Sequence, residues 1–186
     1  AVWLVADAIG GSIGCQGLDM ESPQGDRAIA ALLEEFGAET KVALNQITAT
    51  HKEMKGIRID VSQIPDLVPI LCVAAAAAEG KTEIYNAGRL RMKESDRLAV
   101  MAECMQKIGV EVEEKPDSII ITGGCNPPEG EIVIDSHNDH RIVMAMAIAA
   151  VSLGVELTIL GAEAVNKSYP SFFIELAKLG GVTNVL

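Results

Sequence analysis

Residues 60–80 read DVSQIPDLVPILCVAAAAAEG. A polar opening, an alanine-rich apolar run and a closing glycine are typical of a buried helix that ends at a glycine cap. Residues 135–154 read DSHNDHRIVMAMAIAAVSLG and repeat this layout, and the two closing glycines lie 74 residues apart. A strand-like segment follows each helix, at residues 81–84 and 155–159. This self-similarity indicates that the chain contains copies of one unit.

A second type of helix alternates with the first. Amphipathic helices are expected at residues 26–36 and 96–108, each closed by a glycine, and these glycines lie 72 residues apart. Residues 1–13 resemble the end of an earlier copy. Strands are expected at residues 40–44, 57–61, 110–114 and 119–122. We therefore expect one α/β domain over residues 1–186, with buried helices inside and sheets around them.

The composition excludes several classes of protein. Hydrophobic residues make up 49% of the 186 residues and aromatic residues only 3%, so an aliphatic core is expected. The net charge of −11 argues against binding to nucleic acid or anionic membranes, because both need a basic surface. The longest apolar run, residues 67–78, is about half the length of a membrane-spanning helix. The chain begins without a methionine inside an apolar stretch, so we expect a piece of a longer protein.

The cysteines are far apart in the sequence, at Cys15, Cys72, Cys104 and Cys125. They form no CxxC pair and no Cys/His cluster, so no metal site is expected. Reduced thiols in a cytoplasmic protein are expected rather than disulfides. A plastid location stays open, because a plastid-targeting peptide would lie ahead of residue 1.

A group of cations stands out in this acidic chain. Arg89, Arg91, Lys93 and Arg97 fall within nine residues, at the start of the expected helix 96–108. Free backbone N–H groups and the helix dipole add to their positive field there, which favours a phosphate or a carboxylate. Lys93 and Arg97 are four residues apart, so we expect them to share one helical face. The charge pattern alone equally allows a solvated helix start, in which Glu94 and Arg97 are neighbours.

Other charged residues stand at the starts of the apolar helices. Asp139, His140 and Arg141 directly precede an apolar run, and burial there requires partners for them. Asp139 could pair with Arg141 while His140 caps backbone groups, or these residues could bind a ligand. Asp66 holds nearly the same place in the previous copy, as a base or as an ordinary N-terminal helix residue. Lys167 lies before the expected last helix, residues 171–179, where a lysine is usually a surface residue.

Two motifs resemble those of the 5-enolpyruvylshikimate-3-phosphate synthases. Residues 91–98, RMKESDRL, resemble the RxKExDR signature of this family. Residues 138–141, NDHR, followed by Met144 and Ala145, resemble its NDHR–M–A motif. Further matches in the same order are Gln24-Gly25-Asp26, Pro65-Asp66, and Lys167 ahead of Tyr169-Pro170.

The resemblance implies a fold and a missing partner. The fold would be that of the enolpyruvyl transferases, an inside-out α/β barrel of two domains, each built from three βαβαββ units. This chain would be the C-terminal domain, residues 1–186, with its first repeat incomplete at the N-terminus. The N-terminal domain of the same enzyme would be its partner, and the chain alone would be inactive.

The resemblance also implies a reaction. The enolpyruvyl group of phosphoenolpyruvate would pass to the 5-hydroxyl of shikimate 3-phosphate, with release of phosphate. Arg97 and Arg141 would bind phosphoenolpyruvate with Lys167 beside them, where Lys167 would also take part in catalysis. Lys93 would assist the binding of shikimate 3-phosphate.

Two carboxylates would move protons in this reaction. Asp66 would contact the substrate and take the proton of the 5-hydroxyl, and Glu94 would be the acid and base at the methylene carbon. No cofactor and no metal are implied. Arg89 departs from the family pattern, because some members carry a polar or acidic residue there, and it is therefore left out of the site.

Two other functions fit the same fold. The sister enolpyruvyl transferase acts on UDP-N-acetylglucosamine and also uses phosphoenolpyruvate, although the Lys-Glu-Ser-Asp-Arg and Asp-His-Arg residues favour the shikimate enzyme. A non-catalytic fragment or interaction module of the same fold is the second alternative. The retained charged residues argue against the second alternative.

Overall fold

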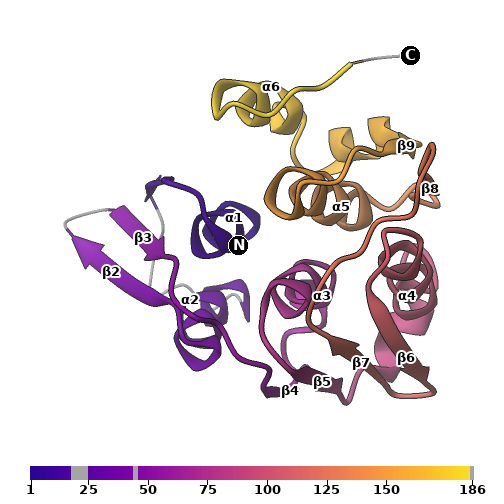
Figure 1. Cartoon of the computed structure of the whole chain (residues 1–186), viewed down its shortest axis with the longest axis horizontal. Coiled ribbons are helices and arrows are strands. Elements are labelled where there is room, and N and C mark those ends of the chain that lie inside the picture. The colour runs from indigo at the N-terminus through magenta and orange to yellow at the C-terminus, as the bar shows by residue number, and fades with distance from the viewer. Residues whose placement is uncertain (18–24, 44–45, 185–186) are drawn as a thin grey trace.

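The computed structural model describes residues 1–17, 25–43 and 46–184. Three helices form its centre and contact one another: α1 (Val2–Ile9), α3 (Val68–Ala77) and α5 (His140–Leu153). The β-sheets lie around these helices, with β2 and β3 on the left of the view and the four-stranded sheet at the bottom (Figure 1). This is the expected arrangement, in which buried helices are inside and sheets outside.

The middle unit contains every element of a βαβαββ repeat. Strands β4 and β5 are parallel, and α3 connects them. The hairpin β6–β7 then adds antiparallel strands, which gives the order β4-β5-β7-β6. The bounds are β4 (Arg58–Asp60), β5 (Lys81–Tyr85), α4 (Arg97–Lys107), β6 (Glu111–Lys115) and β7 (Ser118–Thr122). The expected strands at 57–61, 110–114 and 119–122 are therefore present, with no boundary more than one residue away.

The first unit contains α1 followed by three strands and the helix α2. Its strands form an antiparallel sheet in the order β1-β3-β2. The bounds are β1 (Cys15–Gln16), α2 (Ile29–Phe36), β2 (Glu39–Ala43) and β3 (Gln46–Thr50). The helix expected from residue 26 begins instead as a 3-10 turn, η1 (Gly25–Ala28). Gln24 of the family motif and Leu44, the last residue of the expected strand 40–44, lie outside the described residues.

The third unit repeats the parallel pairing of the second. Strands β8 (Val133–Asp135) and β9 (Thr158–Leu160) are parallel and flank α5. The 3-10 helix η4 (Ala162–Lys167) and the final helix α6 (Phe172–Lys178) follow. The strand expected at 155–159 thus begins three residues later, because the backbone after α5 first completes a turn at Gly154 in the left-handed region, with φ 70°.

Helix α3 is buried on every side. All its residues from Val68 to Ala76 are buried, which agrees with an apolar run that has no polar face. Its alanines have small side chains, so the neighbouring helices α1 and α5 can approach closely. Among the described residues, no helix is both long and apolar enough to cross a membrane.

The four cysteines are free, as expected from their wide spacing in the sequence. Cys72 and Cys104 are buried in the core. Burial raises the pKa of Cys104 to about 12, so this thiol stays protonated at neutral pH.

Thr82 on β5 provides a test of the packing. Its side chain is fully buried, and its hydroxyl finds no hydrogen-bond partner in the part of the chain that the structure describes. Valine has the same shape without the hydroxyl, so Thr82→Val is expected to raise the free energy of unfolding by about 1 kcal/mol. Urea unfolding measures this change. The control Thr50→Val lies at an exposed position of β3 and should change it by less than about 0.5 kcal/mol. A less stable Thr82→Val variant would contradict the prediction.

Candidate functional site

The charged residues singled out in the sequence come together at one end of the central helices. Asp66 lies in η2 (Pro65–Leu67), which leads into α3, and Arg141 lies in the first turn of α5. Lys93 and Glu94 lie between η3 (Gly88–Met92) and α4, and Arg97 is the first residue of α4. Lys167 is the last residue of η4. The following contacts show which of these residues meet.

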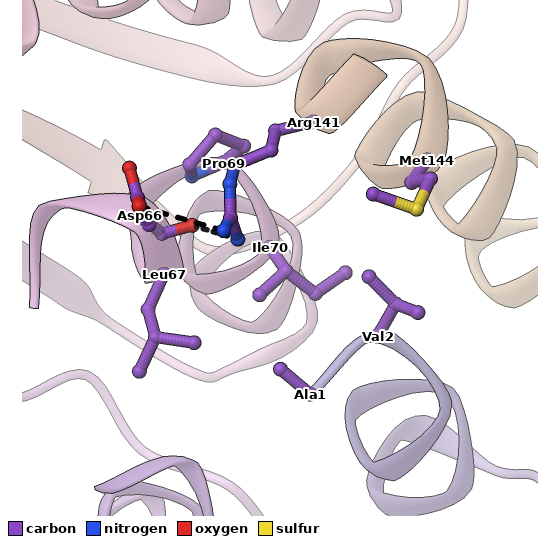
Figure 2. Close-up of a pocket in the computed structure, with 8 residues that line it drawn as sticks. All are labelled: Ala1, Val2, Asp66, Leu67, Pro69, Ile70, Arg141 and Met144. Atoms are coloured by element: carbon purple, nitrogen blue, oxygen red, sulfur yellow. Dashed lines mark hydrogen bonds and ion pairs between the residues drawn. The ribbon is translucent and has the colours of Figure 1, made fainter. Parts of the chain in front are cut away.

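Asp66 is the centre of the cluster. Its Oδ1 accepts hydrogen bonds from Arg97 Nη1 at 2.9 Å and lies 3.2 Å from Lys93 Nζ. Its Oδ2 lies 3.4 Å from Arg141 Nη2, and its backbone carbonyl accepts a bond from Arg141 Nη1 at 3.1 Å (Figure 2). Partial burial acts to raise the pKa of Asp66, but the three cations outweigh it and the pKa is lowered. Asp66 is therefore ionised at neutral pH and shares its charge among three cations.

Arg97 and Asp139 form a buried ion pair. Arg97 Nε donates to Asp139 Oδ2 at 2.8 Å, and Arg97 Nη2 donates to Oδ1 at 3.3 Å. The residues are only 2% and 0% exposed. Asp139 thus fixes the side chain of Arg97, whose Nη1 bonds to Asp66. The interpretation of Arg97 as part of a solvated helix start is wrong, because this residue is buried.

Asp139 is also the N-cap of α5. Its Oδ1 accepts a bond from the backbone N–H of Arg141 at 2.9 Å, and Ser95 Oγ donates to its Oδ2 at 3.2 Å. Burial acts to raise the pKa of Asp139, but the bonds from Arg97, Arg141 and Ser95 outweigh it and lower the pKa. The alternative in which Asp139 pairs with the side chain of Arg141 is wrong, because only the backbone N–H of Arg141 reaches it.

Glu94 belongs to a second, more exposed group. Its Oε2 lies 3.3 Å from His140 Nδ1 and 3.4 Å from Lys167 Nζ. Lys167 Nζ also donates to the carbonyl oxygen of Asn138. Asn138 has a left-handed backbone, with φ 57°, which is uncommon for a residue other than glycine. Glu94 therefore faces Lys167 and His140 and not Arg97, and His140 contacts a carboxylate and not the backbone groups expected of a cap.

Two of the four clustered cations do not reach the site. Arg91 donates to Asp96 Oδ2 at 3.0 Å and pairs with Glu114 Oε1 at 2.8 Å, so it ties the start of α4 to the β6–β7 hairpin. Arg89 is exposed. The expectation that Lys93 and Arg97 share a helical face is wrong, because Lys93 precedes the helix with an extended backbone. The two side chains nevertheless meet at Asp66.

Asp26 also reaches the cluster, although the sequence assigns it no role. Its Oδ2 lies 3.7 Å from Arg141 Nη1, so it joins the cluster from the first unit. Its sequence signal is its place in the Gln24-Gly25-Asp26 motif, which the family shares. Together the three units supply Asp26, Asp66 and Arg141 to one contact network.

A small open pocket adjoins the Asp66–Arg141 pair. Figure 2 shows this pair at one edge and apolar side chains from α1, α3 and α5 along the rest. The lining is completed by Ala1, Val2, Leu67, Pro69, Ile70 and Met144. The polar contacts of a ligand would thus come from the charged edge.

Three possible metal ligands also lie near one another. Ligand atoms of Glu94, Asp139 and His140 are within 4.8 Å of one another. The lone pairs of Asp139 are directed at Arg97, and Glu94 faces Lys167, so both carboxylates already face cations. The carboxylates are therefore already paired with Arg97 and Lys167, and these cations suit the binding of an anion better than the group suits a metal ion.

Two copies of the repeat use the same turn ahead of their buried helices. Asp60 Oδ1 accepts a bond from the backbone N–H of Ser62, and Asp135 Oδ1 accepts one from His137. These two aspartates are 75 residues apart, and Asp66 and Arg141 are also 75 residues apart. The central ion pair of the site therefore joins equivalent positions of two copies.

Comparison with solved structures places the fold among the enolpyruvyl transferases. EPSP synthase from Acinetobacter baumannii superposes with a TM-score of 0.79 at 29% identity, covering 97% of this chain and 45% of that chain. The enolpyruvyl transferase NikO from Streptomyces tendae superposes with a TM-score of 0.75 at 20% identity, covering 97% of this chain and 42% of that one, and shows the fold alone.

The sequence comparisons give the family. The model of the family EPSP synthase (3-phosphoshikimate 1-carboxyvinyltransferase) matches residues 1–176, and the chain belongs to this family. The 3-phosphoshikimate 1-carboxyvinyltransferase of Clostridium kluyveri is 48% identical over 181 residues, which are 97% of this chain and 42% of that protein. The protein of the same name from Pyrococcus abyssi is 43% identical over 95% of this chain and 42% of its own length. The chain thus spans less than half the length of these relatives.

Proposed function

We propose that this chain supplies half of the active site that transfers the enolpyruvyl group of phosphoenolpyruvate to the 5-hydroxyl of shikimate 3-phosphate. The observation that carries the proposal is the gathering of Lys93, Arg97 and Arg141 around Asp66 in a chain of net charge −11. Such a concentration of cations fits a multiply anionic substrate. The names of the relatives favour shikimate 3-phosphate over the UDP-sugar of the sister enzyme.

Phosphoenolpyruvate fits the two arginines of the cluster. Arg97 and Arg141 carry planar guanidinium groups, which bind carboxylates and phosphates through two parallel hydrogen bonds. Both lie in the first turns of helices, where the helix dipole favours an anion beside the carboxylates of Asp96 and Asp139 that cap these helices. Lys167 would complete this subsite, and Lys93 would face shikimate 3-phosphate.

The carboxylates fit the proton transfers. The 5-hydroxyl oxygen adds to C2 of phosphoenolpyruvate, Asp66 takes the hydroxyl proton, and Glu94 donates a proton to the methylene carbon. In the second step Glu94 recovers a proton from the new methyl group while the C2–O bond to phosphate breaks. The departing phosphate takes the proton that Asp66 holds, so the products are the enol ether and hydrogen phosphate, and both carboxyl groups return to their starting protonation states. Positioned acids and bases of this kind contribute about 10²–10⁴-fold each.

The proposal includes a partner. We propose that residues 1–186 form the C-terminal domain and that an N-terminal domain supplies the remaining contacts, because the relatives are more than twice as long. The isolated chain is then expected to bind substrates weakly and to lack turnover. A cytoplasmic location agrees with the four free thiols. The paired site residues argue against a non-catalytic module.

A chimeric enzyme, called the joined enzyme below, tests the proposal. This chain replaces the matching segment of the Clostridium kluyveri relative, and phosphate release from phosphoenolpyruvate plus shikimate 3-phosphate is measured for the joined enzyme and for the chain alone. Turnover is expected only in the joined enzyme. Turnover by the chain alone would contradict the half-site, and a folded but inactive joined enzyme would contradict the function.

Two arginine variants of the joined enzyme test the site. Arg141→Ala removes a charged hydrogen-bonding group and is expected to lower kcat/KM for phosphoenolpyruvate by about tenfold to a hundredfold. Arg89→Ala removes the same charge at an exposed position and is expected to change it by less than about twofold. Equal losses in both variants would show that net charge, and not the cluster, sets the affinity.

A further inference from the structure

Most of the aromatic residues of this chain lie in one group. The sequence has one tryptophan, two tyrosines and three phenylalanines. Trp3 stacks on Phe172 with ring centroids 5.1 Å apart, and Tyr169 lies edge-on to both rings, at 6.3 Å from Trp3 and 5.8 Å from Phe172. Phe173 contacts Phe172 at 5.2 Å. The group joins α1 at the start of the chain to Tyr169, which follows η4, and to the first turn of α6.

A hydrogen bond within this group spans 166 residues of sequence. Trp3 Nε1 donates to the hydroxyl oxygen of Tyr169 at 3.1 Å, and both groups are partly buried. An indole N–H and a phenol usually find such partners when their rings are buried. This bond therefore fixes the tip of the Tyr169 side chain relative to α1, which packs against α3 and α5.

Tyr169 lies two residues after Lys167 in a tight turn. The backbone N–H groups of Ser168 and Tyr169 both donate to the carbonyl oxygen of Val165, at 3.1 and 2.7 Å. Val165 is buried. The backbone of Lys167 is thus held between a buried residue on one side and the aromatic group on the other.

The side chain of Lys167 needs this support. It is 40% exposed, and its contacts with Glu94 and the Asn138 carbonyl are at the surface. Exposed lysine contacts are weak, because a long side chain loses conformational entropy when it is fixed. A fixed backbone reduces the conformations that the lysine must give up when it binds an anion.

We propose that Trp3 and Tyr169 are positioning residues that hold Lys167 in the anion site. This inference rests on the proposed function for the identity of the anion, phosphoenolpyruvate. Among the described residues, the polar groups of Trp3 and Tyr169 bond to each other and not to the charged cluster, so both act through the position of Lys167. They hold it by joining the third unit to the first.

Kinetics of the joined enzyme test the proposal. Tyr169→Phe keeps the ring and removes the hydrogen bond, and Trp3→Phe removes the same bond while a smaller aromatic ring replaces the indole, so each is expected to raise KM for phosphoenolpyruvate about three- to tenfold. KM for shikimate 3-phosphate and kcat should change by less than about twofold. The double variant should match the single variants, because all three lose the same bond. The control Tyr85→Phe makes the same chemical change on β5 and should leave both KM values unchanged.

A merely structural role would give a different result. Partial unfolding lowers the concentration of active enzyme, and therefore the apparent kcat, without changing either KM. Unchanged KM for phosphoenolpyruvate, equal changes in both KM values, or multiplied effects in the double variant would each overturn the proposal.

A second measurement does not depend on turnover. Acetylation of single lysines in the 186-residue chain, followed by mass spectrometry, reports how firmly each amine is held. Lys107 is the control, because it is 41% exposed and pairs with a glutamate, as Lys167 does at 40% exposure. Trp3→Phe and Tyr169→Phe are expected to raise the rate at Lys167 at least about threefold, with Lys107 unchanged. An unchanged rate at Lys167 would overturn the positioning role even if the enzyme transfers enolpyruvyl groups as proposed.

Discussion

Asp139→Asn is expected to lower the free energy of unfolding of this chain by about 3–5 kcal/mol, because it removes the fully buried carboxylate beside Arg97 and leaves the buried guanidinium with only the more exposed Asp66. Asparagine keeps an oxygen that can accept the N–H of Arg141, so the helix cap survives and the charge alone is removed. Urea unfolding at pH 7 measures the change. Asp96→Asn is the matched control, since Asp96 also caps a helix and pairs with an arginine, but at the surface. It should cost no more than about 1 kcal/mol, and an equal cost in both variants would contradict the prediction.

The same variant changes the response to acid. The folded chain holds the pKa of Asp139 below its unfolded value of about 3.9. The stabilisation from this carboxylate is therefore complete above the unfolded pKa and is lost as the pH falls through the lower folded pKa. Unfolding free energies measured from pH 7 down to acid should fall less steeply for Asp139→Asn than for the unchanged chain. Parallel curves would show that Asp139 does not contribute to acid unfolding.

Asp66→Asn is expected to remove turnover while tightening the binding of a simple anion. The carboxylate of Asp66 pairs with the cations of Lys93, Arg97 and Arg141. Any incoming phosphate must therefore compete with Asp66 for these cations. Removing this charge should strengthen the binding of inorganic phosphate to the chain by about tenfold, measured by calorimetry. In the joined enzyme, loss of the proposed base should reduce kcat by about 10²–10⁴-fold.

Asp60→Asn is the control for net charge. Asp60 is exposed at the end of β4, where it bonds to Ser62 and Asn86 and not to the cations of the site. This variant has the same net charge as Asp66→Asn, and it should bind phosphate no more than about twofold better than the unchanged chain. Equal tightening in the two variants would contradict the competition between Asp66 and phosphate.

Local sequence patterns were sufficient for the helices and most strands of the fold. The run at residues 67–78 has no polar face, so it could only be a buried helix, and α3 is buried along its length. Strand β1 has only two residues, too few for a period of two to be visible, and β8 is not predicted although β4 and β9, which are equally short, are. The strand β3 follows β2 so closely that no composition change separates them.

The site shows where local reasoning ends. The family motifs brought together residues that the structure also brings together, including Asp66, Arg97 and Arg141, whereas their chemical roles stay predictions. The pairing of Arg97 with Asp139 joins residues 42 apart, and nothing in either motif specifies it. Arg91 turns away from the charged cluster because it pairs with Glu114, which lies in the β6–β7 hairpin further along the sequence. Such contacts follow from the packing of the units and not from the spacing of cations.

The pairing of Asp66 with Arg141 has a consequence for how such a site can arise. Tandem duplication of one unit would first have placed the same side chain at both positions, and packing of the buried helices would have brought two identical groups face to face. Identical groups give either repulsion between like charges or no charge at all. An acid beside a base at these positions therefore requires that the copies diverged after duplication. In this chain the asymmetry between Asp66 and Arg141 is a record of lost internal symmetry.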